Sequence, residues 1–258
     1  MNSPPPATHL VPCGLPTVPD IPFVGLRFIS DVILTSPAGH PDVMLLQARY
    51  HLQNYSEALF KDFDLALPDH LQKAVKKRRA EYLASRVCVR YGLSLLGIDN
   101  YVLSNDADRA PLWPAGFSGS LSHTHQRISL LLAPANSGKL LGIDCEQLIR
   151  PETAKEMQEM IINAGESDLL QHSGLPFATS LTLAFSVKES LYKAIFPRLR
   201  EFMDFSTAEI VDYSPAAGTI VLKLARTFST EFPLGRLFIG HIQLGQDDVL
   251  SWIVTPQA

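Results

Sequence analysis

The stretch Phe185-Ser-Val-Lys-Glu-Ser-Leu-Tyr-Lys-Ala194 guides the interpretation of the whole chain. It places Lys188, Glu189 and Lys193 inside a helix that is otherwise apolar, and the preceding run, residues 177–185, carries no charge. An unpaired charge is costly to bury, so these three charges need partners. Glu189 and Lys193 are four residues apart and share a helix face, where they can pair with each other. The stretch is either a solvated salt-bridged turn or a set of functional groups.

The composition is that of an ordinary globular protein. The chain has 258 residues, 46% of them hydrophobic and 19% charged, which is enough for one large domain or two small ones with a normal core. The net charge of −4 argues against non-specific nucleic-acid binding, because such binding needs a broad positive surface. There is no apolar run of about 18 residues, so no membrane span is expected. Residues 1–14 lack the basic and apolar segments of a secretory signal.

Three cysteines, Cys13, Cys88 and Cys145, are widely spaced and odd in number. This pattern favours reduced thiols and a cytoplasmic location over a disulfide framework. No cysteine has a partner at CxxC spacing. His123 and His125 share a face at strand spacing, but no third ligand is nearby, so we expect a histidine that donates a hydrogen bond to a phosphate, or a structural histidine, rather than a zinc site.

The first half begins with an arm, residues 1–20, that contains six prolines. A strand is predicted over Pro22–Leu34. A long helix is predicted from about Pro68, which suits a first helical turn, to Tyr91, with Gly92 as its stop. The region between them, residues 43–60, has mixed character and gives no clear assignment.

The predicted long helix carries the strongest positive cluster of the chain. Arg79, Arg86 and Arg90 line one stripe on it. The stripe is either a solvated face or a site for a ligand with several phosphates, for which arginines are well suited.

A strand over Leu140–Glu146 carries two carboxylates at its end. Asp144 and Glu146 face one side with Gly142, and Cys145 faces the other. Adjacent carboxylates repel each other unless a cation lies between them. They form either a solvated strand end or a Mg²⁺ site, because Mg²⁺ prefers carboxylate oxygens and phosphate ligands.

The remaining elements follow from periodicity and turn residues. Pro134–Lys139 has the composition of a hinge. Helices are predicted over Pro151–Ile162 and Glu166–Gln171, and Pro197 is predicted to end the central helix. Alternation in the tail predicts four strands, over Glu209–Tyr213, Thr219–Leu224, Leu237–Gln243 and Val249–Val254.

Together these segments contain the groups that a phosphoryl-type transfer needs: cations, metal-binding carboxylates and a further carboxylate as base. In this combination the chain resembles the stand-alone, two-lobed 4′-phosphopantetheinyl transferases, in particular the enterobactin-synthase component D group and its pseudomonad relatives. The matching segments, in the family's order, are Lys77–Arg86, Arg109–Pro114, Gly119–His123, Gly142–Glu146 and Leu183–Ala194.

The resemblance implies a reaction in which coenzyme A donates its phosphopantetheine arm to a serine hydroxyl of an apo acyl or peptidyl carrier protein. Adenosine 3′,5′-bisphosphate leaves. Asp144, Glu146 and Glu189 match the family's magnesium triad, for which Mn²⁺ is an alternative ion. Glu189 also matches the proposed general base, acting directly or through a water. Lys193 matches the lysine that contacts the pyrophosphate and stabilises the leaving phosphate.

Further matches fall on positions that bind coenzyme A in the family. They are Ser122 and His123 at a phosphate, Arg86 and Arg79 around the 3′-phosphate, Pro111 in the adenine-contacting loop, and Lys188 at a CoA phosphate. Cys145 departs from the acidic or apolar residue of many relatives. It faces away from the carboxylates on a strand, so we expect it to have little effect.

The resemblance also implies an α+β fold, a pseudo-dimer of two similar lobes with mostly antiparallel sheets and a long helix on each. The expected organisation is an arm at 1–20, lobe one at 21–136 and lobe two at 137–258, with CoA in the cleft between the lobes. A monomer is expected.

Two other hypotheses compete with the transferase: a non-catalytic module that grips CoA or carrier proteins, and a metal-dependent phosphohydrolase acting on CoA-like nucleotides. The carrier itself is not identified by the sequence. Met157, Met160 and Phe202 could contact it, although we expect the methionines to belong to the core.

Overall fold

The computed structural model of the protein describes residues 9–13 and 27–257. Most of the predicted proline-rich arm, and the beginning of the strand predicted over Pro22–Leu34, therefore lie outside the described residues. Contacts divide the chain into two compact units. We call Val11–Ala135 the first unit and Asn136–Ala258, which also takes in His9 and Leu10, the second unit.

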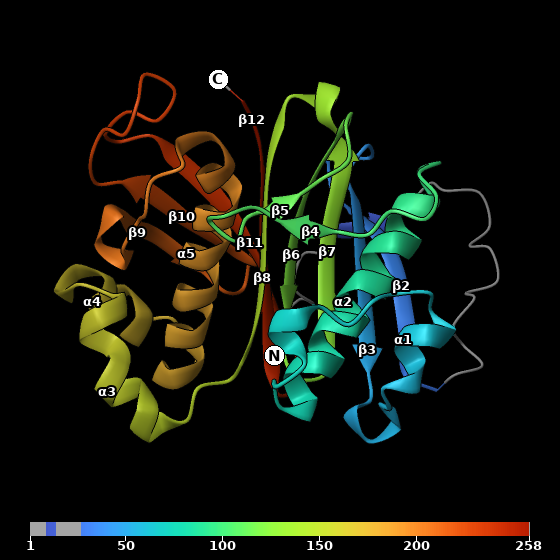
Figure 1. The fold of residues 1–258 in the computed structure, drawn as a ribbon. Helices are drawn as coiled ribbons and strands as arrows, with labels where there is room; N and C mark the ends of the chain where they lie inside the picture. Colours follow the sequence, from blue (N-terminus) through green and yellow to red (C-terminus); the bar gives the residue numbers. More distant parts are fainter. Residues whose placement is uncertain (1–8, 14–26, 258) are drawn as a thin grey trace. The chain divides into compact units, whose positions relative to one another are not determined.

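The first unit is a five-stranded sheet with one long helix, α2, packed on β3, β6 and β7 (Figure 1). The strand order is β1-β2-β3-β7-β6, and β3 pairs antiparallel with both β2 and β7, as β6 does with β7. The elements are β1 (Leu10–Pro12), β2 (Ile29–Pro37), β3 (Met44–Tyr50), α1 (Ala58–Asp62), α2 (Lys76–Ser94), β4 (Ser104–Asn105), β5 (Pro111–Leu112), β6 (Phe117–His123) and β7 (Arg127–Pro134).

Helix α2 starts later than predicted. Pro68 precedes a separate short 3-10 helix, Asp69–Leu71, whose Asp69 carboxylate accepts a hydrogen bond from the Gln72 side chain at 2.9 Å. Val75 is then extended, with φ −63° and ψ 153°. This extended residue interrupts the helical path, so α2 begins only at Lys76.

Gly92 lies inside α2 and does not stop it, which corrects the prediction. A Cβ at Gly92 would lie 3.1 Å from the side chains of both Leu130 and Leu132. The glycine therefore serves the close packing of α2 on β7. A glycine that allows close packing of a helix and a glycine that ends a helix look the same in a sequence.

The second unit is also a five-stranded sheet with one long helix, α5, which packs on β8, β12 and β11 (Figure 1). The strand order is β8-β12-β11-β10-β9, and all four neighbouring pairs are antiparallel. The elements are β8 (Lys139–Gln147), α3 (Pro151–Ile161), α4 (Ala164–Gln171), α5 (Phe177–Leu199), β9 (Ala208–Ser214), β10 (Thr219–Leu224), β11 (Leu237–Leu244) and β12 (Asp248–Pro256), with the 3-10 helix η5 (Phe205–Thr207) between α5 and β9.

Helix α5 continues through Pro197 and ends at Leu199, two residues beyond the predicted end. Proline lacks the amide hydrogen that would bond the carbonyl of Lys193, so its cost inside a helix is mainly the loss of that bond. In the last turn few further bonds depend on it, and the helix terminates when Arg200 adopts a left-handed conformation with φ 53°.

The α+β class, with antiparallel sheets and a long helix in each unit, is confirmed. The strand predicted over Leu140–Glu146 is β8, and the four strands predicted in the tail are β9 to β12. Buried and more exposed residues alternate along β10 and most of β11, whereas β8 and β12 are buried along nearly their whole length; both patterns are typical of strands.

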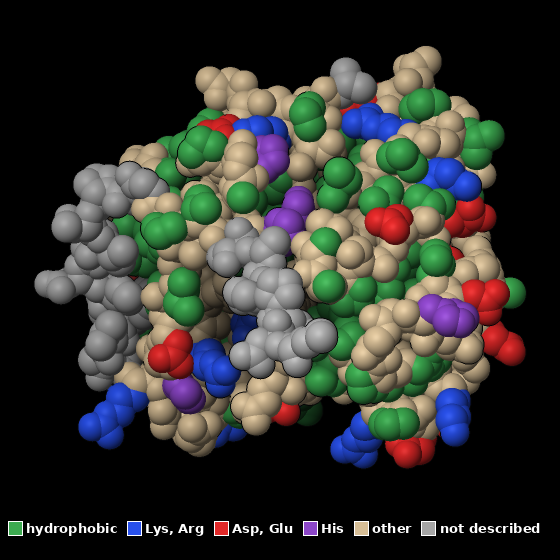
Figure 2. Space-filling model, turned by 180° about the vertical axis from the view of Figure 1, so that it is seen from behind, with side chains coloured by type: hydrophobic (Ala, Val, Ile, Leu, Met, Phe, Trp, Pro, Cys, Tyr) green, Lys and Arg blue, Asp and Glu red, His purple; other side chains and the backbone are tan. Residues whose placement is uncertain are grey.

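Within the described residues, no helix is both long and apolar enough to cross a membrane. On the face shown in Figure 2, the lysine and arginine side chains of the described residues lie singly or in small groups among hydrophobic and uncharged ones. This distribution agrees with the net charge of −4.

Candidate active site

The two carboxylates of β8 face helix α5. Asp144 and Glu146 are two residues apart on the strand, on the same side as Gly142, and β12 pairs with them through Ser251 and Val249. A Cβ added at Gly142 would overlap the carbonyl oxygen of Ser190 on α5. The backbones of β8 and α5 therefore approach each other as only a glycine allows, and this brings the acids of β8 close to the side chains of α5.

Buried hydroxyl groups fix α5 along the sheet. Ser190 Oγ donates to the carbonyl oxygen of Ser251 at 3.0 Å, and Ser251 Oγ lies 2.8 Å from the hydroxyls of both Ser186 and Ser190. All three serines are fully buried. Because buried hydroxyls must be paired, these contacts favour a single position of α5 along β12.

Lys193 forms an ion pair with Asp144. Its Nζ donates to Asp144 Oδ1 at 2.6 Å, and the side chains are 28% and 3% exposed. Burial alone would lower the pKa of Lys193, but the adjacent Asp144 outweighs it and the pKa is raised. Lys193 of α5 thus neutralises the charge of Asp144 on β8.

The two glutamates near this pair have raised pKa values. Burial, with repulsion from Asp144 and Glu189, raises the pKa of Glu146 to about 7, while Lys193 opposes the shift. Burial also raises the pKa of Glu189, with Lys193 opposing and Asp144 adding to the effect. Three carboxylates and one ammonium thus form a cluster with excess negative charge, a setting that a further cation would stabilise.

The donor types of this cluster suit a hard divalent cation, which prefers carboxylate oxygens. In the described part of the chain, however, no group of three or more His, Cys, Asp or Glu side chains is placed to hold a metal ion. Asp144, Glu146 and Glu189 are neighbours but do not converge on one point. An ion bound by all three would require these side chains to turn, and Lys193 to yield part of its contact with Asp144.

A groove of about 370 Å³ opens beside Glu189. Its other lining residues come from the end of α3, from α5 and from the segment before β9: Met160, Tyr192, Phe202, Met203, Asp204, Phe205 and Ser206. Met160 is 64% exposed and Phe202 is 76% exposed. The expectation that both methionines belong to the core is therefore wrong for Met160, whereas Met157 packs against the core of the unit.

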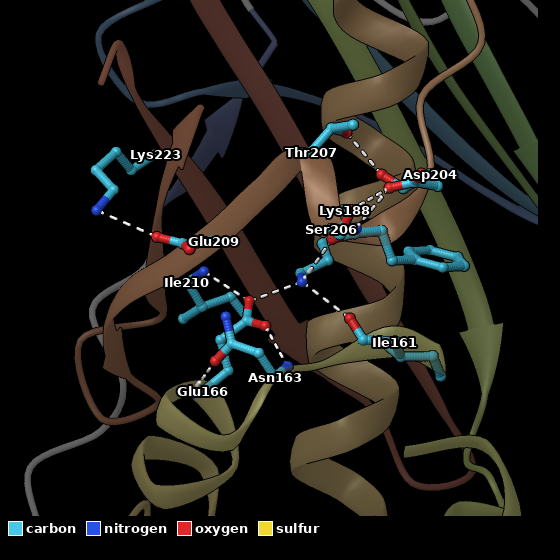
Figure 3. A network of polar contacts seen from close by, with 11 residues as sticks. Ile161, Asn163, Glu166, Lys188, Asp204, Ser206, Thr207, Glu209, Ile210 and Lys223 are labelled. Atoms are coloured by element: carbon cyan, nitrogen blue, oxygen red, sulfur yellow. Dashed lines mark hydrogen bonds and ion pairs between the residues drawn. The ribbon is translucent and has the colours of Figure 1, made fainter. Parts of the chain in front are cut away.

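Lys188, next to Glu189, is directed into the protein (Figure 3). Its Nζ lies 2.7 Å from Glu166 Oε1 and donates to the carbonyl oxygens of Ile161 at 2.9 Å and Phe205 at 3.0 Å. Burial lowers the pKa of Lys188, and Glu166 opposes that shift. These three partners account for the three N–H donors of the ammonium, so contact with a CoA phosphate would require it to give up at least one of them.

The arginines predicted to bind phosphate lie on α2 and contact groups of the first unit. Arg79 forms an ion pair with Glu57. Arg86 donates to the Leu103 carbonyl oxygen at 3.0 Å and to Asn105 Oδ1 at 2.7 Å, and its guanidinium lies 4.4 Å from the centre of the Tyr82 ring. Burial lowers the pKa of Arg86, with Tyr82 opposing the shift.

Arg86 and Pro111 are brought together by the small β4–β5 hairpin. Asn105, which accepts the bond from Arg86, is the strand partner of Pro111. The third arginine of the predicted stripe, Arg90, lies apart from this hairpin and donates to the carbonyl oxygens of Phe63 at 2.6 Å and Asp64 at 3.1 Å. The structure therefore divides the stripe, and Arg90 has a structural role.

Ser122 and His123 lie at the end of β6, opposite Ser129 and Ile128 of β7. Ser122 is buried and His123 is half-buried. Strand β6 is an edge of its sheet, and its backbone pairs with β7.

Comparison with known families matches both units. Residues 67–133 match the 4′-phosphopantetheinyl transferase N-terminal domain, and residues 140–236 match the 4′-phosphopantetheinyl transferase superfamily. Enterobactin synthase component D of Salmonella typhimurium is 37% identical over 184 residues, which are 70% of this chain and 75% of that protein. The chain belongs to the 4′-phosphopantetheinyl transferase superfamily.

Other members of the superfamily are similar over a shorter range. Enterobactin synthase component D of Escherichia coli K12 is 36% identical over 56% of this chain and 69% of its own length. The 4′-phosphopantetheinyl transferase Svp of Streptomyces mobaraensis is 33% identical over 60% of this chain and 63% of its own length. A solved holo-[acyl-carrier-protein] synthase from Thermotoga maritima covers 46% of this chain and 64% of its own, with 21% identity and a TM-score of 0.35.

Within this phosphopantetheinyl transferase, sequence reasoning missed Glu166 and the groove residues Tyr192 and Phe205. Asn163-x-x-Glu166 has the pattern of a capping box, and it does form one: Asn163 Oδ1 accepts from the Glu166 amide while Glu166 Oε2 accepts from the Asn163 amide. That signal could have located the start of α4. Nothing in the sequence indicated that the same carboxylate also binds Lys188.

Proposed function

We propose that this phosphopantetheinyl transferase moves the 4′-phosphopantetheine moiety of coenzyme A to a serine hydroxyl of an apo acyl or peptidyl carrier protein. The observation that carries the proposal is the cluster of Asp144, Glu146, Glu189 and Lys193, built where α5 packs on β8 in a chain of this superfamily. Its acids offer a base and ligands for a divalent ion, and its lysine offers a cation for a phosphate.

In the proposed reaction the serine oxygen forms a bond to the phosphorus that carries the pantetheine arm. The bond from that phosphorus to the bridging oxygen of the pyrophosphate breaks, and adenosine 3′,5′-bisphosphate leaves with the electron pair. Glu189 accepts the serine proton, directly or through a water. Its raised pKa makes it a stronger base than an ordinary glutamate, which is the tuning expected of a general base near neutral pH.

Lys193 stabilises the leaving phosphate in this proposal. Its ammonium now binds Asp144, so it must turn partly toward the phosphate when coenzyme A is present. Magnesium, or manganese in its place, held by Asp144, Glu146 and Glu189 would neutralise charge on the pyrophosphate. Neutralising this cluster would also relieve the repulsion that raises the pKa of Glu146.

Residues of the first unit are proposed to bind coenzyme A. Arg86 and Pro111, which are linked through Asn105 of the β4–β5 hairpin, are assigned to the 3′-phosphate and adenine. Ser122 and His123 are assigned to a phosphate. Arg79 is a weaker candidate, because it must release Glu57 first.

The decisive experiment is transfer to an apo carrier protein, followed as the mass increase of the carrier. Glu189→Gln should abolish transfer while coenzyme A still binds, and chelation of divalent ions should abolish transfer reversibly. Glu152→Gln, at an exposed position of α3, is the matched control and should transfer normally. A normal rate in the Glu189 variant would overturn the assignments of base and metal ligand.

The same reaction separates the two competing functions. A phosphohydrolase would cleave coenzyme A without any carrier, and a non-catalytic module would bind coenzyme A without turnover. A panel of apo carriers should begin with those of siderophore-forming peptide synthetases, because several relatives are enterobactin synthase components. Fatty-acid and polyketide carriers complete the panel. The cytoplasmic location and the monomeric state stay predictions.

A further inference from the structure

The buried ion pair of Lys188 and Glu166 joins five segments of the second unit: α3, α4, α5, η5 and β9 (Figure 3). Both side chains are only 3% exposed. Lys188 reaches from α5 to the end of α3 at Ile161 and to η5 at Phe205. Glu166 Oε1 also accepts from the Ile210 amide of β9 at 2.7 Å, and its Oε2 closes the capping box of α4.

Stability alone does not explain such a pair. Removing two charges from water costs several kcal/mol per ion, and well-packed apolar residues often stabilise a fold as well or better. What an ion pair with directed hydrogen bonds adds is geometry, since each bond fixes the place of its partner. The role of the ion pair is therefore to be inferred from the segments that Lys188 holds in place.

Lys188 fixes the wall of the groove beside Glu189. Phe205, whose carbonyl oxygen it binds, lines that groove with Tyr192 and Phe202. The turn that holds Phe205 is closed locally, because Asp204 Oδ1 accepts from the amide and the hydroxyl of Ser206 at 2.9 Å and 2.6 Å. The hydrogen bonds within this turn fix its shape but not its position relative to α5, which requires a contact with the helix.

The attachment is made one residue before Glu189. The Phe205 ring packs against Phe185 of α5, with ring centres 5.3 Å apart, and the bond from Lys188 adds a directed polar contact. A loss of the ammonium would leave the ring contact in place but free the carbonyl. The wall could then shift relative to the Glu189 carboxylate without unfolding the unit.

We propose that Lys188 is a positioning residue that anchors the 200–207 segment and the α3–α4 junction to α5, and so fixes the groove through which the acceptor serine reaches Glu189. This inference rests on the proposed function, in which Glu189 is the base. It assigns Lys188 to the acceptor side of the reaction, not to coenzyme A.

The test is Lys188→Met, which keeps the length of the side chain and removes the ammonium. We expect the apparent KM for the apo carrier to rise about tenfold or more, because small displacements of a reacting group have large kinetic effects. The Kd of coenzyme A, measured by calorimetry, should not change. Amide hydrogen exchange over residues 200–207 should increase about tenfold, and exchange over β10 should not change.

The matched control is Lys223→Met. Lys223 pairs with Glu209 at 3.2 Å in the same unit, but both side chains are 39% exposed. Removing this lysine should change neither the KM for the carrier nor exchange over 200–207.

Two results would overturn the proposal. Weaker binding of coenzyme A with an unchanged KM for the carrier would mean that Lys188 contacts a phosphate. A lower Tm with unchanged kinetic constants and unchanged exchange over 200–207 would mean that Lys188 only supports the fold. If the Lys188 variant does not fold, Glu166→Gln, which removes the charge of the partner, is judged by the same criteria. A wild-type protein that never modifies a carrier would refute the proposed function, and the exchange experiment would still decide whether Lys188 anchors the segment.

Discussion

Replacing Glu146 with glutamine should stabilise the metal-free protein at pH 8 and have little effect near pH 5. Burial and the negative charges of Asp144 and Glu189 raise the pKa of this carboxyl from 4.5 to about 7, despite the opposing effect of Lys193. Glutamine has nearly the same shape and carries no charge. The substitution therefore removes the electrostatic cost and keeps most of the packing.

The raised pKa determines the direction of the effect. Between pH 4.5 and about pH 7 the native protein holds a proton that the unfolded chain has released, so the free energy of unfolding falls as the pH rises through this window. Below the window the carboxyl is neutral in both states. Above it the carboxyl is ionised in both, and the native state carries the full cost.

The magnitude follows from the size of the shift. One pKa unit corresponds to about 1.4 kcal/mol, so the shift of Glu146 from 4.5 to about 7 sets an upper limit of about 3 kcal/mol. Glu146 is half-buried, and solvent screening reduces the expected gain to about 1–2 kcal/mol. This gain in the free energy of unfolding includes the loss of repulsion between Glu146 and Glu189, whose pKa is also raised.

The assay is urea unfolding in EDTA at a series of pH values, for wild type and Glu146→Gln. A Trp113→Phe background leaves Trp252, buried in β12 next to β8, as the fluorescent reporter of the second unit. Glu152→Gln serves as the control for removing an exposed acid. If the free energy of unfolding has the same pH dependence in wild type and Glu146→Gln, the proposed raised pKa of Glu146 is refuted. Added Mg²⁺ should reduce the difference if the cluster binds the ion.

Three further predictions concern the same unit and the core of the first. Gly142→Ala should destabilise the protein by about 1–3 kcal/mol or more, because the methyl group would overlap the Ser190 carbonyl oxygen; Gly165→Ala in α4, which meets only Asn163 at 3.4 Å, is its control in the same unfolding assay. Lys193→Met should cost about 3 kcal/mol near neutral pH by leaving the buried Asp144 without its cation, and acid should reduce this loss; a loss independent of pH would contradict the ion pair. Burial raises the pKa of Cys88 to about 12, so this thiol should not react with a disulfide reagent until the protein unfolds, as peptide mapping of the labelled protein will show.

Local patterns predicted the elements that obey one strong rule. The tail strands β10 and β11 alternate, and the run that became β8 is apolar with two acids at its end. The spacing of Asp144 and Glu146 correctly placed both on the face that contains Gly142. These features depend on neighbours in the chain, which a sequence displays directly.

Features that depend on distant contacts were predicted poorly. Gly92 and Pro197 were both interpreted as ends of helices, because their intrinsic preferences are strong. Gly92 instead serves the packing of α2 against β7, and Pro197 is tolerated in a helix that ends two residues later. Met160 was expected in the core, yet it is 64% exposed and lines the groove, because periodicity alone does not show which apolar residues of a helix face its neighbours.

The candidate site shows the same limit for charges. The sequence suggested Glu189 as the natural partner of Lys193, but the Lys193 ammonium donates to Asp144, 49 positions earlier in the chain, at 2.6 Å. Lys188, adjacent to the proposed base, could not be distinguished from a ligand-binding lysine until Glu166 was located beside it. The sequence identified the charged residues of the cluster, but local spacing cannot show which of them pair when they lie far apart in the chain.

Strand β8 lies at the edge of its sheet, and β12 is its one neighbour there. Asp248 pairs with Gln147, so this neighbour is made about a hundred residues later, and at about 5–20 residues per second the ribosome needs several seconds to supply it. During that time Asp144 and Glu146 belong to a nascent chain with no sheet to join. Assembly of the acidic cluster is therefore a late event in biosynthesis. A chain that ends before β12 lacks the strand that pairs with Asp144 and Glu146, so its carboxylates are not arranged for any chemistry.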